Sequence, residues 1–287
     1  MTKKSKNLLK TDPTRTITLR NRAVGDINRR YTKVQRLVTE SIVTNKIFSN
    51  ARALDQADFV FLRSPDKLEA FNVWLTSVMH EIIVGGTATP NSAQLNWMLH
   101  YYKESYVRGV KKTNNNFAGI YGRNQIPNRV DVLSVPYHIA KTSLLFTRDF
   151  AQLKGITDVV SQQLSFYLSE GLLKGQNPNK IAKTLKERID VLGKTRSRLL
   201  ARTEIINTHN LGMINEGQAL GELLGENVYY EWITAEDIKV RDSHISRNNK
   251  FYTYEKVSQL IGEPNCRCAT PAIPESQLPE GTKVIGK

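Results

Sequence analysis

Apolar residues recur at steps of three and four along residues 17–44, and this spacing constrains the fold more than any other feature of the chain. The members of this stripe are Val24, Ile27, Tyr31, Val34, Val38 and Ile42. Because an α-helix turns once every 3.6 residues, these side chains lie on one face of a single helix. The stripe is narrow, so the helix needs a partner: another helix of this chain, a second copy or a different protein.

Further segments with helical spacing follow, and proline, glycine or asparagine marks their ends. Ser64-Pro65 has the N-cap serine and first-turn proline of a helix start, and Gly85-Gly86 is expected to end that helix. The sequence also predicts helices from Pro90 to Val110, after Pro136, from Thr157 to Leu173 with Gly175 as C-cap, and from Asn177-Pro178 to Ile189. Asn114-Asn115-Asn116 is expected to break the helix that starts at Pro90, and residues 113–130 to form a loop.

The last third of the chain changes character. A helix over residues 194–224 is followed by the aromatic and β-branched segment 228–233, which favours a strand, and by a short second strand at residues 251–252. We predict a mainly α fold, in which a basic N-terminal helical arm and a helical bundle precede a small α+β C-terminal domain. The predicted boundaries are 1–60 for the arm, 61–193 for the helical domain, 194–270 for the α+β domain and 271–287 for an extended tail.

Positive charge is concentrated at the start of the chain. The net charge is +14, and residues 1–50 carry 12 lysines and arginines against three acidic residues, whereas residues 194–287 carry 12 of each. We expect such an arm to contact double-stranded DNA independently of sequence, or an acidic protein surface, although a merely solvated charged helix would show the same pattern. The residues expected to make these contacts are Arg15, Arg20, Arg22, Arg29, Arg30, Lys33 and Arg36.

Both cysteines of the chain lie in the segment Pro264-Asn265-Cys266-Arg267-Cys268. A C-x-C pair cannot readily close a relaxed disulfide, but its two thiolates can bind one metal ion. The candidate ligands of a structural zinc are His244, Cys266 and Cys268, which we expect to converge, with His209 or Asp237 as the fourth. The alternative is a metal-free cluster in which the cysteines are small buried residues and His244 forms a hydrogen bond with a carbonyl group.

Four charged residues near this segment are expected to have a structural role. They are Arg202 and Glu204 on the predicted helix, and Asp237 and Arg241 in the loop after the first strand. Ion pairs among them would hold the loop against the helix, and removal of one partner from a partly buried pair would leave the other charge unpaired.

The same residues carry a resemblance to a known family. The ordered set A-R-T-E at 201–204, an aromatic strand that ends in Trp232, D-x-K-V-R-x-S-H at 237–244 and P-N-C-R-C at 264–268 resembles the C-terminal signature of the phage minor head proteins. This is the head-morphogenesis family typified by the F protein of phage Mu. The resemblance implies a virion protein without enzymatic activity, which lies in the head interior near the portal vertex after assembly in the host cytoplasm. It further implies contact with the portal protein or major capsid protein and with packaged DNA, and a role in head assembly or DNA ejection.

An enzymatic alternative rests on a looser similarity. Asp242-Ser243-His244 followed by Asn248 resembles part of an HNH motif, which would make the protein a metal-dependent nuclease, but no histidine follows His244 as a second ligand. No P-loop, dinucleotide-binding, nucleophile-elbow or H-E-x-x-H motif is present. No apolar run reaches the roughly 18 residues of a membrane span, so no membrane partner is expected. Two cysteines in a chain of 287 residues argue against a disulfide scaffold.

Overall fold

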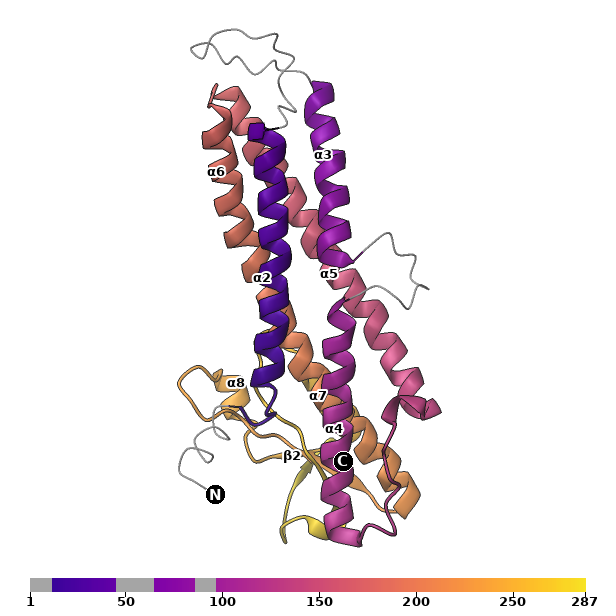
Figure 1. The fold of residues 1–287 in the computed structure, drawn as a ribbon. Coiled ribbons are helices and arrows are strands. Elements are labelled where there is room, and N and C mark those ends of the chain that lie inside the picture. The colour runs from indigo at the N-terminus through magenta and orange to yellow at the C-terminus, as the bar shows by residue number, and fades with distance from the viewer. Residues whose placement is uncertain (1–11, 45–64, 86–96) are drawn as a thin grey trace. The chain divides into compact units, whose positions relative to one another are not determined.

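The computed structural model describes residues 12–44, 65–85 and 97–287 of the chain (Figure 1). Two compact units are present. The bundle unit comprises Ala23–Trp97 and Thr147–Leu200, and the C-terminal unit joins Met98–Phe146 and Ala201–Lys287 with the start of the chain up to Arg22. The predicted fold class, mainly α with a small α+β C-terminal part, is confirmed. The boundaries predicted at residues 60, 193 and 270 do not coincide with those of the two units.

Helices make up the described part of the bundle unit. They are α2 (Ile17–Thr39) with the π-turn η1 (Glu40–Thr44), α3 (Pro65–Met79) with η2 (His80–Val84), most of α5 (Pro136–Leu173), α6 (Pro178–Arg188), η4 (Ile189–Lys194) and the start of α7 (Thr195–Leu224). The stripe predicted on α2 is buried from Ile27 to Ile42. Its partner is this same chain, because the Tyr31 hydroxyl lies 2.9 Å from Ser197 Oγ and the Gln35 amide donates to the Lys186 carbonyl oxygen at 3.0 Å.

The helix ends in this unit follow the predicted capping residues. α3 is described from Pro65, the expected N-cap Ser64 lies outside the described residues, and Gly85 follows η2 with a φ of 102°. The Asn177 side chain accepts from Lys180 N at 2.9 Å, and Gly175 has a φ of 62°. One prediction is wrong: no separate helix starts at Thr157, because α5 is continuous from Pro136 to Leu173. Gly155, just before Thr157, costs the helix only about 1 kcal/mol, and no proline interrupts this segment, so the helix continues through it.

The helix predicted from Pro90 starts outside the described residues, and α4 is described over Trp97–Tyr121. It passes through the three asparagines that were expected to break it, so that part of the prediction is wrong. The Asn114 amide donates at 3.0 Å to both the Pro127 carbonyl oxygen and Glu216 Oε1. These tertiary hydrogen bonds override the weak helix propensity of asparagine, and the predicted loop begins only after Tyr121.

A four-stranded sheet lies in the C-terminal unit. Its strands are β1 (Val228–Glu231), β2 (Phe251–Tyr252), β3 (Ala272–Pro274) and β4 (Val284–Ile285), in the order β3-β1-β2-β4. β1 is antiparallel to β2 and β3, whereas β2 and β4 are parallel. Two short helices, α8 (Asp242–Ile245) and α9 (Tyr254–Leu260), lie between the strands in sequence. The predicted extended tail, residues 271–287, therefore supplies two strands of the sheet.

The backbones of α4 and α7 touch in the core of this unit. A Cβ atom added to Gly109 would lie 2.1 Å from the His209 carbonyl oxygen, and one added to Gly212 would lie 2.3 Å from the Tyr106 carbonyl oxygen. Each helix thus presents a glycine where the other helix presents backbone. Real Cβ atoms essentially never come within 3.0 Å of another heavy atom, so any side chain at these two positions would disrupt the contact.

A buried carboxylate lies beside this contact. Glu216 on α7 is fully buried and forms ion pairs at 2.9 Å with Arg129 and with His138 Nε2, in addition to its hydrogen bond with Asn114. The other nitrogen of His138 lies 3.0 Å from the Tyr106 hydroxyl. A buried charge is tolerated only when its hydrogen-bonding capacity is met, so this cluster fixes the positions of α4, α5 and α7 in this unit.

We expect Gly109→Ala to lower the free energy of unfolding by about 2–4 kcal/mol, because the new methyl group would overlap backbone atoms of α7 that cannot move separately. Gly119→Ala is the matched control on the same helix: it is exposed, and nothing lies within 4 Å of its added Cβ. The control should stabilise the protein by about 0.5–1 kcal/mol. Urea unfolding of both variants tests this, and equal effects would contradict the close contact.

Candidate metal centre

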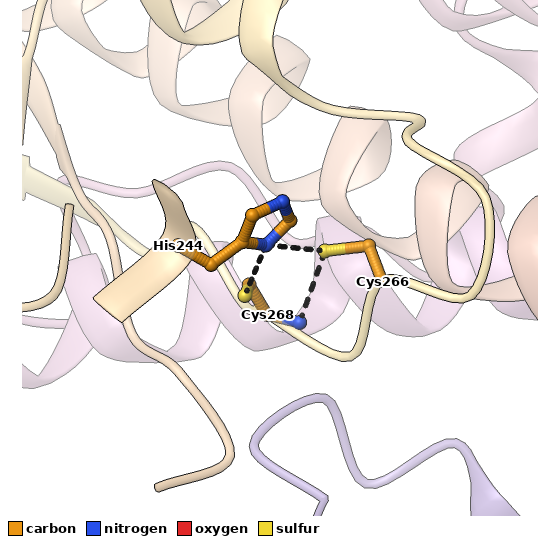
Figure 2. A group of neighbouring side chains, drawn as sticks. All are labelled: His244, Cys266 and Cys268. Atoms are coloured by element: carbon orange, nitrogen blue, oxygen red, sulfur yellow. Dashed lines mark hydrogen bonds between the residues drawn. The ribbon is translucent and has the colours of Figure 1, made fainter. Parts of the chain in front are cut away.

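Three potential metal ligands converge in the C-terminal unit. One ligand atom each from His244, Cys266 and Cys268 lies within 4.8 Å of the others, and all three residues are buried. His244 Nδ1 is 3.2 Å from Cys268 Sγ and 3.6 Å from Cys266 Sγ (Figure 2). The histidine comes from α8 and the cysteines from the loop that precedes β3. The convergence expected from the sequence is therefore present.

Helix α7 and the first strand hold the cysteine loop in place. The backbone N–H of Asn265 donates to Thr203 Oγ1 at 3.0 Å, and the Asn210 amide donates to the Cys268 carbonyl oxygen at 3.0 Å. Directly after Cys268, Ala269 pairs with Ile233 in an antiparallel bridge that extends β1. Asn265 adopts a φ of 59°, which asparagine tolerates better than most residues, and this allows the sharp turn before Cys266.

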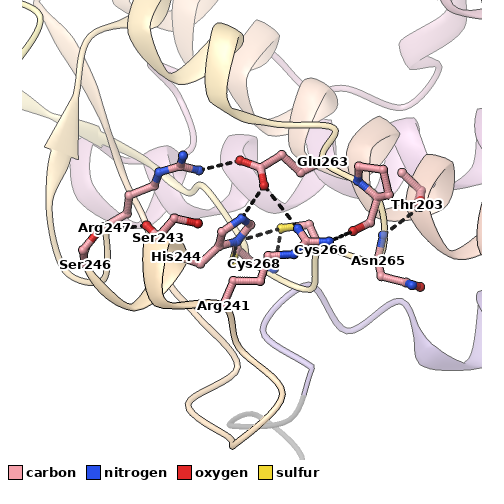
Figure 3. A network of polar contacts seen from close by, with 11 residues as sticks. Thr203, Arg241, Ser243, His244, Ser246, Arg247, Glu263, Asn265, Cys266 and Cys268 are labelled. Atoms are coloured by element: carbon pink, nitrogen blue, oxygen red, sulfur yellow. Dashed lines mark hydrogen bonds and ion pairs between the residues drawn. The ribbon is translucent and has the colours of Figure 1, made fainter.

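Glu263 fixes the orientation of the histidine ring (Figure 3). Its carboxylate lies 2.8 Å from His244 Nε2 and 2.8 Å from Arg247, with Arg241 at 3.2 Å. Burial alone would raise the pKa of Glu263, but the hydrogen bonds from His244 and Arg247 outweigh it and hold the pKa at about 2. The ionised carboxylate can only accept, so it holds the ring with Nε2 toward Glu263 and Nδ1 toward the two sulfur atoms.

The two thiols have opposite tendencies to ionise. Hydrogen bonding from Cys268 lowers the pKa of Cys266 to about 6, and the backbone N–H of Cys268, 3.4 Å from the Cys266 sulfur, contributes. The pKa of Cys268 is raised, because its hydrogen bond to Cys266 and its burial both disfavour a second negative charge. One thiolate forms readily here, and the second needs an added positive charge nearby.

A small cavity borders all three ligands. It has a volume of about 70 Å³, and its other lining residues are Ala235, Lys239, Val240, Arg241, Asn265 and Arg267. On another side of the cluster, the Trp232 ring meets the His244 ring edge-on at 5.6 Å, and the Arg247 guanidinium lies 5.1 Å from the centre of the Trp232 ring. The Trp232 ring thus packs against one side of the cluster, and the cavity on another side is lined in part by cationic side chains.

The two residues proposed as fourth ligand lie outside this cluster. His209 is buried on α7, and burial, with Lys112 and Arg108 nearby, lowers its pKa to about 3. Asp237 forms a double ion pair with Arg267, at 2.5 and 2.6 Å, which lowers the pKa of Asp237 to about 2.

Two of the charged residues assigned a structural role pair with residues that were not named in advance. Asp237 pairs with Arg267, and Arg241 pairs with Glu263. Arg202 is exposed and Glu204 is buried, and Thr203 between them makes the hydrogen bond to the cysteine loop. The sequence analysis missed Glu263 and Arg267. Their sequence positions could have indicated both residues, since Glu263 lies three residues before Cys266 and Arg267 lies between the two cysteines.

Seven basic residues were expected to contact a partner. Four of them are held in different surroundings, and one of these four is buried. Arg20 is buried and pairs with Asp12 at 3.1 Å, so it cannot contact a partner. Arg22 pairs with Glu104 at 3.2 Å, and the Arg30 guanidinium donates to the Ile82 carbonyl oxygen at 2.6 Å and stacks on Trp97. Arg15 is exposed in the turn before α2.

The remaining three, Arg29, Lys33 and Arg36, are exposed on α2 and are spaced by four and three residues. They therefore lie on one face of the helix, which we call the basic face.

The protein is thus mainly helical, and one histidine and two cysteines are buried together in its small C-terminal α+β part. Residues 162–271 match a family model described as Phage Mu protein F like protein. This part of the chain is Mu F-like, and the resemblance to the phage head-morphogenesis family is confirmed over these residues, which are less than half of the chain. Comparisons with curated proteins and with solved structures each found no significant match.

The Glu263 carboxylate predicts a specific pH dependence of stability. Its pKa falls from 4.5 to about 2 on folding, so the stability that it contributes is present above pH 4.5 and is lost as the pH falls toward 2. Glu263→Gln should lower the free energy of unfolding at pH 7 by about 1 kcal/mol. The difference in this free energy between the variant and the wild type should shrink as the pH falls from 4.5 to about 2. Urea unfolding with a chelator present measures this. The exposed control Glu280→Gln should behave as wild type, and a constant gap for Glu263→Gln would contradict the assignment.

Proposed function

We propose that this phage head-morphogenesis protein is a structural component of the virion, which lies inside the head near the portal vertex. It would dock on the portal protein or the major capsid protein and meet packaged double-stranded DNA through the basic face of α2. The observation that carries this proposal is the Mu F-like match over residues 162–271, which includes the cysteine cluster and α7. Among the described residues, no helix has the length and apolarity to cross a bilayer.

The basic face has the properties of a phosphate-binding surface. Arg29 and Arg36 are 74% and 65% exposed, and their partners, Asp26 and Glu40, are neighbours on the same helix. Exposed ion pairs of this kind contribute at most about 1 kcal/mol, so a phosphate can replace the carboxylate at little cost. A groove of about 300 Å³ lies alongside, and it is lined by three cationic and two acidic side chains and one apolar one: Arg29, Arg30, Lys33, Asp26, Glu81 and Ile82. Such contacts would bind DNA without reading its sequence.

The nuclease alternative gains no support from the geometry around His244. Asn248, the asparagine of the HNH-like pattern, accepts a hydrogen bond from the Thr234 backbone N–H at 2.8 Å and so holds the turn before β2. The second nitrogen of His244 is engaged by Glu263. Incubation of the purified protein with plasmid and Mg²⁺ or Mn²⁺ separates the two functions, because nicking that His244→Ala abolishes would favour the nuclease.

The combined substitution Arg29→Gln, Lys33→Gln and Arg36→Gln should weaken binding to a DNA duplex and flatten its salt dependence. Each lost phosphate contact reduces the slope of log affinity against log salt by about 0.9, so a decrease of about 2–3 is expected. A matched control removes three exposed charges elsewhere: Lys174→Gln, Lys250→Gln and Lys283→Gln. Fluorescence anisotropy at several salt concentrations measures both variants. If the control weakens binding as much, net charge rather than the basic face is responsible.

A component of the head should remain with heads after they are purified, whether or not they contain DNA. Quantitative mass spectrometry of separated empty and DNA-filled heads should detect this protein in both at a constant ratio to the portal protein. Its absence from both would overturn the proposal. Its presence in filled heads alone would show that DNA holds it there and would overturn docking on the head proteins.

A further inference from the structure

We propose that His244 Nδ1, Cys266 Sγ and Cys268 Sγ bind one zinc ion, and that its fourth coordination position opens on the adjoining cavity to water or a small anion. The proposal concerns the C-terminal unit alone and does not depend on the role of the protein in the phage head. It differs from the closed four-ligand site expected from the sequence, in which His209 or Asp237 would complete the tetrahedron.

The separations of the donor atoms fit a tetrahedral zinc site. With Zn–S and Zn–N bonds of about 2.3 and 2.0 Å, a tetrahedral angle places sulfur and nitrogen roughly 3.5 Å apart. The two measured separations, 3.2 and 3.6 Å, lie on either side of this value. Nδ1 of His244 is in contact with both sulfurs, as the two dashed lines in Figure 2 show, and a single metal ion between the three atoms would account for both contacts.

The surroundings of His244 are those of a metal ligand. Histidines that bind metals usually donate the hydrogen of the second ring nitrogen to a carboxylate or carbonyl group, which sets the tautomer and the ring orientation. Glu263 has this position, at 2.8 Å from Nε2, and Arg247 and Arg241 hold it there (Figure 3). The carboxylate binds the far nitrogen of the ring, so it orients a ligand and is not itself the fourth one.

Within the part of the chain that the structure describes, no further histidine, cysteine, aspartate or glutamate joins the three ligands. Asp237 is held by Arg267, and His209 lies outside the group. The cavity of about 70 Å³ that borders all three ligands has room for a water molecule or a small anion. Lys239, Arg241 and Arg267 line this cavity; Arg241 and Arg267 are paired with Glu263 and Asp237, but all three side chains supply hydrogen-bond donors for a water molecule or a small anion in the fourth position.

The ligand set selects the class of metal. Two thiolates and an imidazole suit zinc, whereas magnesium and calcium prefer oxygen ligands. Bound zinc would connect α8 to the cysteine loop, which Thr203 and Asn210 already hold against α7. The metal would thus complete a continuous connection from α7 through the loop to α8.

The first experiment measures metal content in the full-length protein, purified without metal-affinity resin and dialysed against zinc. About one zinc per chain is expected by elemental mass spectrometry, and cobalt substitution should give the intense visible bands of four-coordinate cobalt with thiolate charge transfer. His244→Ala, Cys266→Ser and Cys268→Ser should each abolish stoichiometric binding. Glu263→Gln should weaken it roughly 10- to 100-fold.

Two controls separate ligand loss from general damage. Val257→Ala removes buried volume from the same hydrophobic cluster without touching a ligand, and His100→Ala removes an exposed histidine. Both should retain one zinc. A wild-type protein that takes up no zinc, or a Val257→Ala variant that loses zinc as completely as Cys266→Ser, would overturn the site.

The second experiment tests the fourth position with thiocyanate as the probe. Titration of the cobalt-substituted protein should shift its visible spectrum with saturation, because thiocyanate replaces the exchangeable ligand. Val240→Phe, which would fill the cavity beside the site, should keep the cobalt bands and lose the shift. A spectrum that thiocyanate leaves unchanged in the wild type would overturn the open position, and an equal shift in Val240→Phe would overturn its placement in this cavity.

Discussion

The contact between the backbones of α4 and α7 is the constraint on which the C-terminal unit depends. Gly109 and Gly212 allow carbonyl groups of one helix to approach the Cα atoms of the other. Helix α7 then presents Glu216 to partners from other segments of the unit, and Thr203 and Asn210 to the cysteine loop. A shift of α7 by one residue would separate all three from their partners at once, so the close contact fixes the register that every later hydrogen bond requires.

Two of the polar clusters in this unit lie around a carboxylate, one fully buried and the other 35% exposed. Glu216 with Arg129 and His138 stabilises the helices, and Glu263 with His244 and the cysteines stabilises the loops. A buried charged cluster contributes little net free energy compared with a well-packed apolar core, but loss of one partner is costly. Loss of either carboxylate would therefore leave its cationic partners without a counter-charge, and the side chains around it would no longer be held in place.

The sequence predicted the elements that local spacing determines and failed where distant residues decide. The stripe from Ile27 to Ile42, the N-cap Asn177 and the meeting of His244 with the cysteines follow from periodicity, capping chemistry and the scarcity of cysteine. The helix through Asn114 did not follow, because its hydrogen-bond partners lie 13 and 102 residues away. The contacts of Arg20 with Asp12 and of His244 with Glu263 were also missed, because their partners lie 8 and 19 residues apart, beyond one turn of a helix. Short-range patterns cannot show which distant charge a side chain will meet.

The composition of the C-terminal unit has a consequence for the order in which the protein folds. The segment from Asp12 to Arg22 packs in the same unit as β4, near residue 285. Lys112 donates a hydrogen bond to the Pro13 carbonyl oxygen, so α4 contacts this early segment. On the ribosome, the bundle unit has all its residues once Leu200 has emerged, whereas the sheet of the C-terminal unit must wait for its last strand. The unit that holds His244 and the two cysteines therefore has all its residues later than the bundle unit.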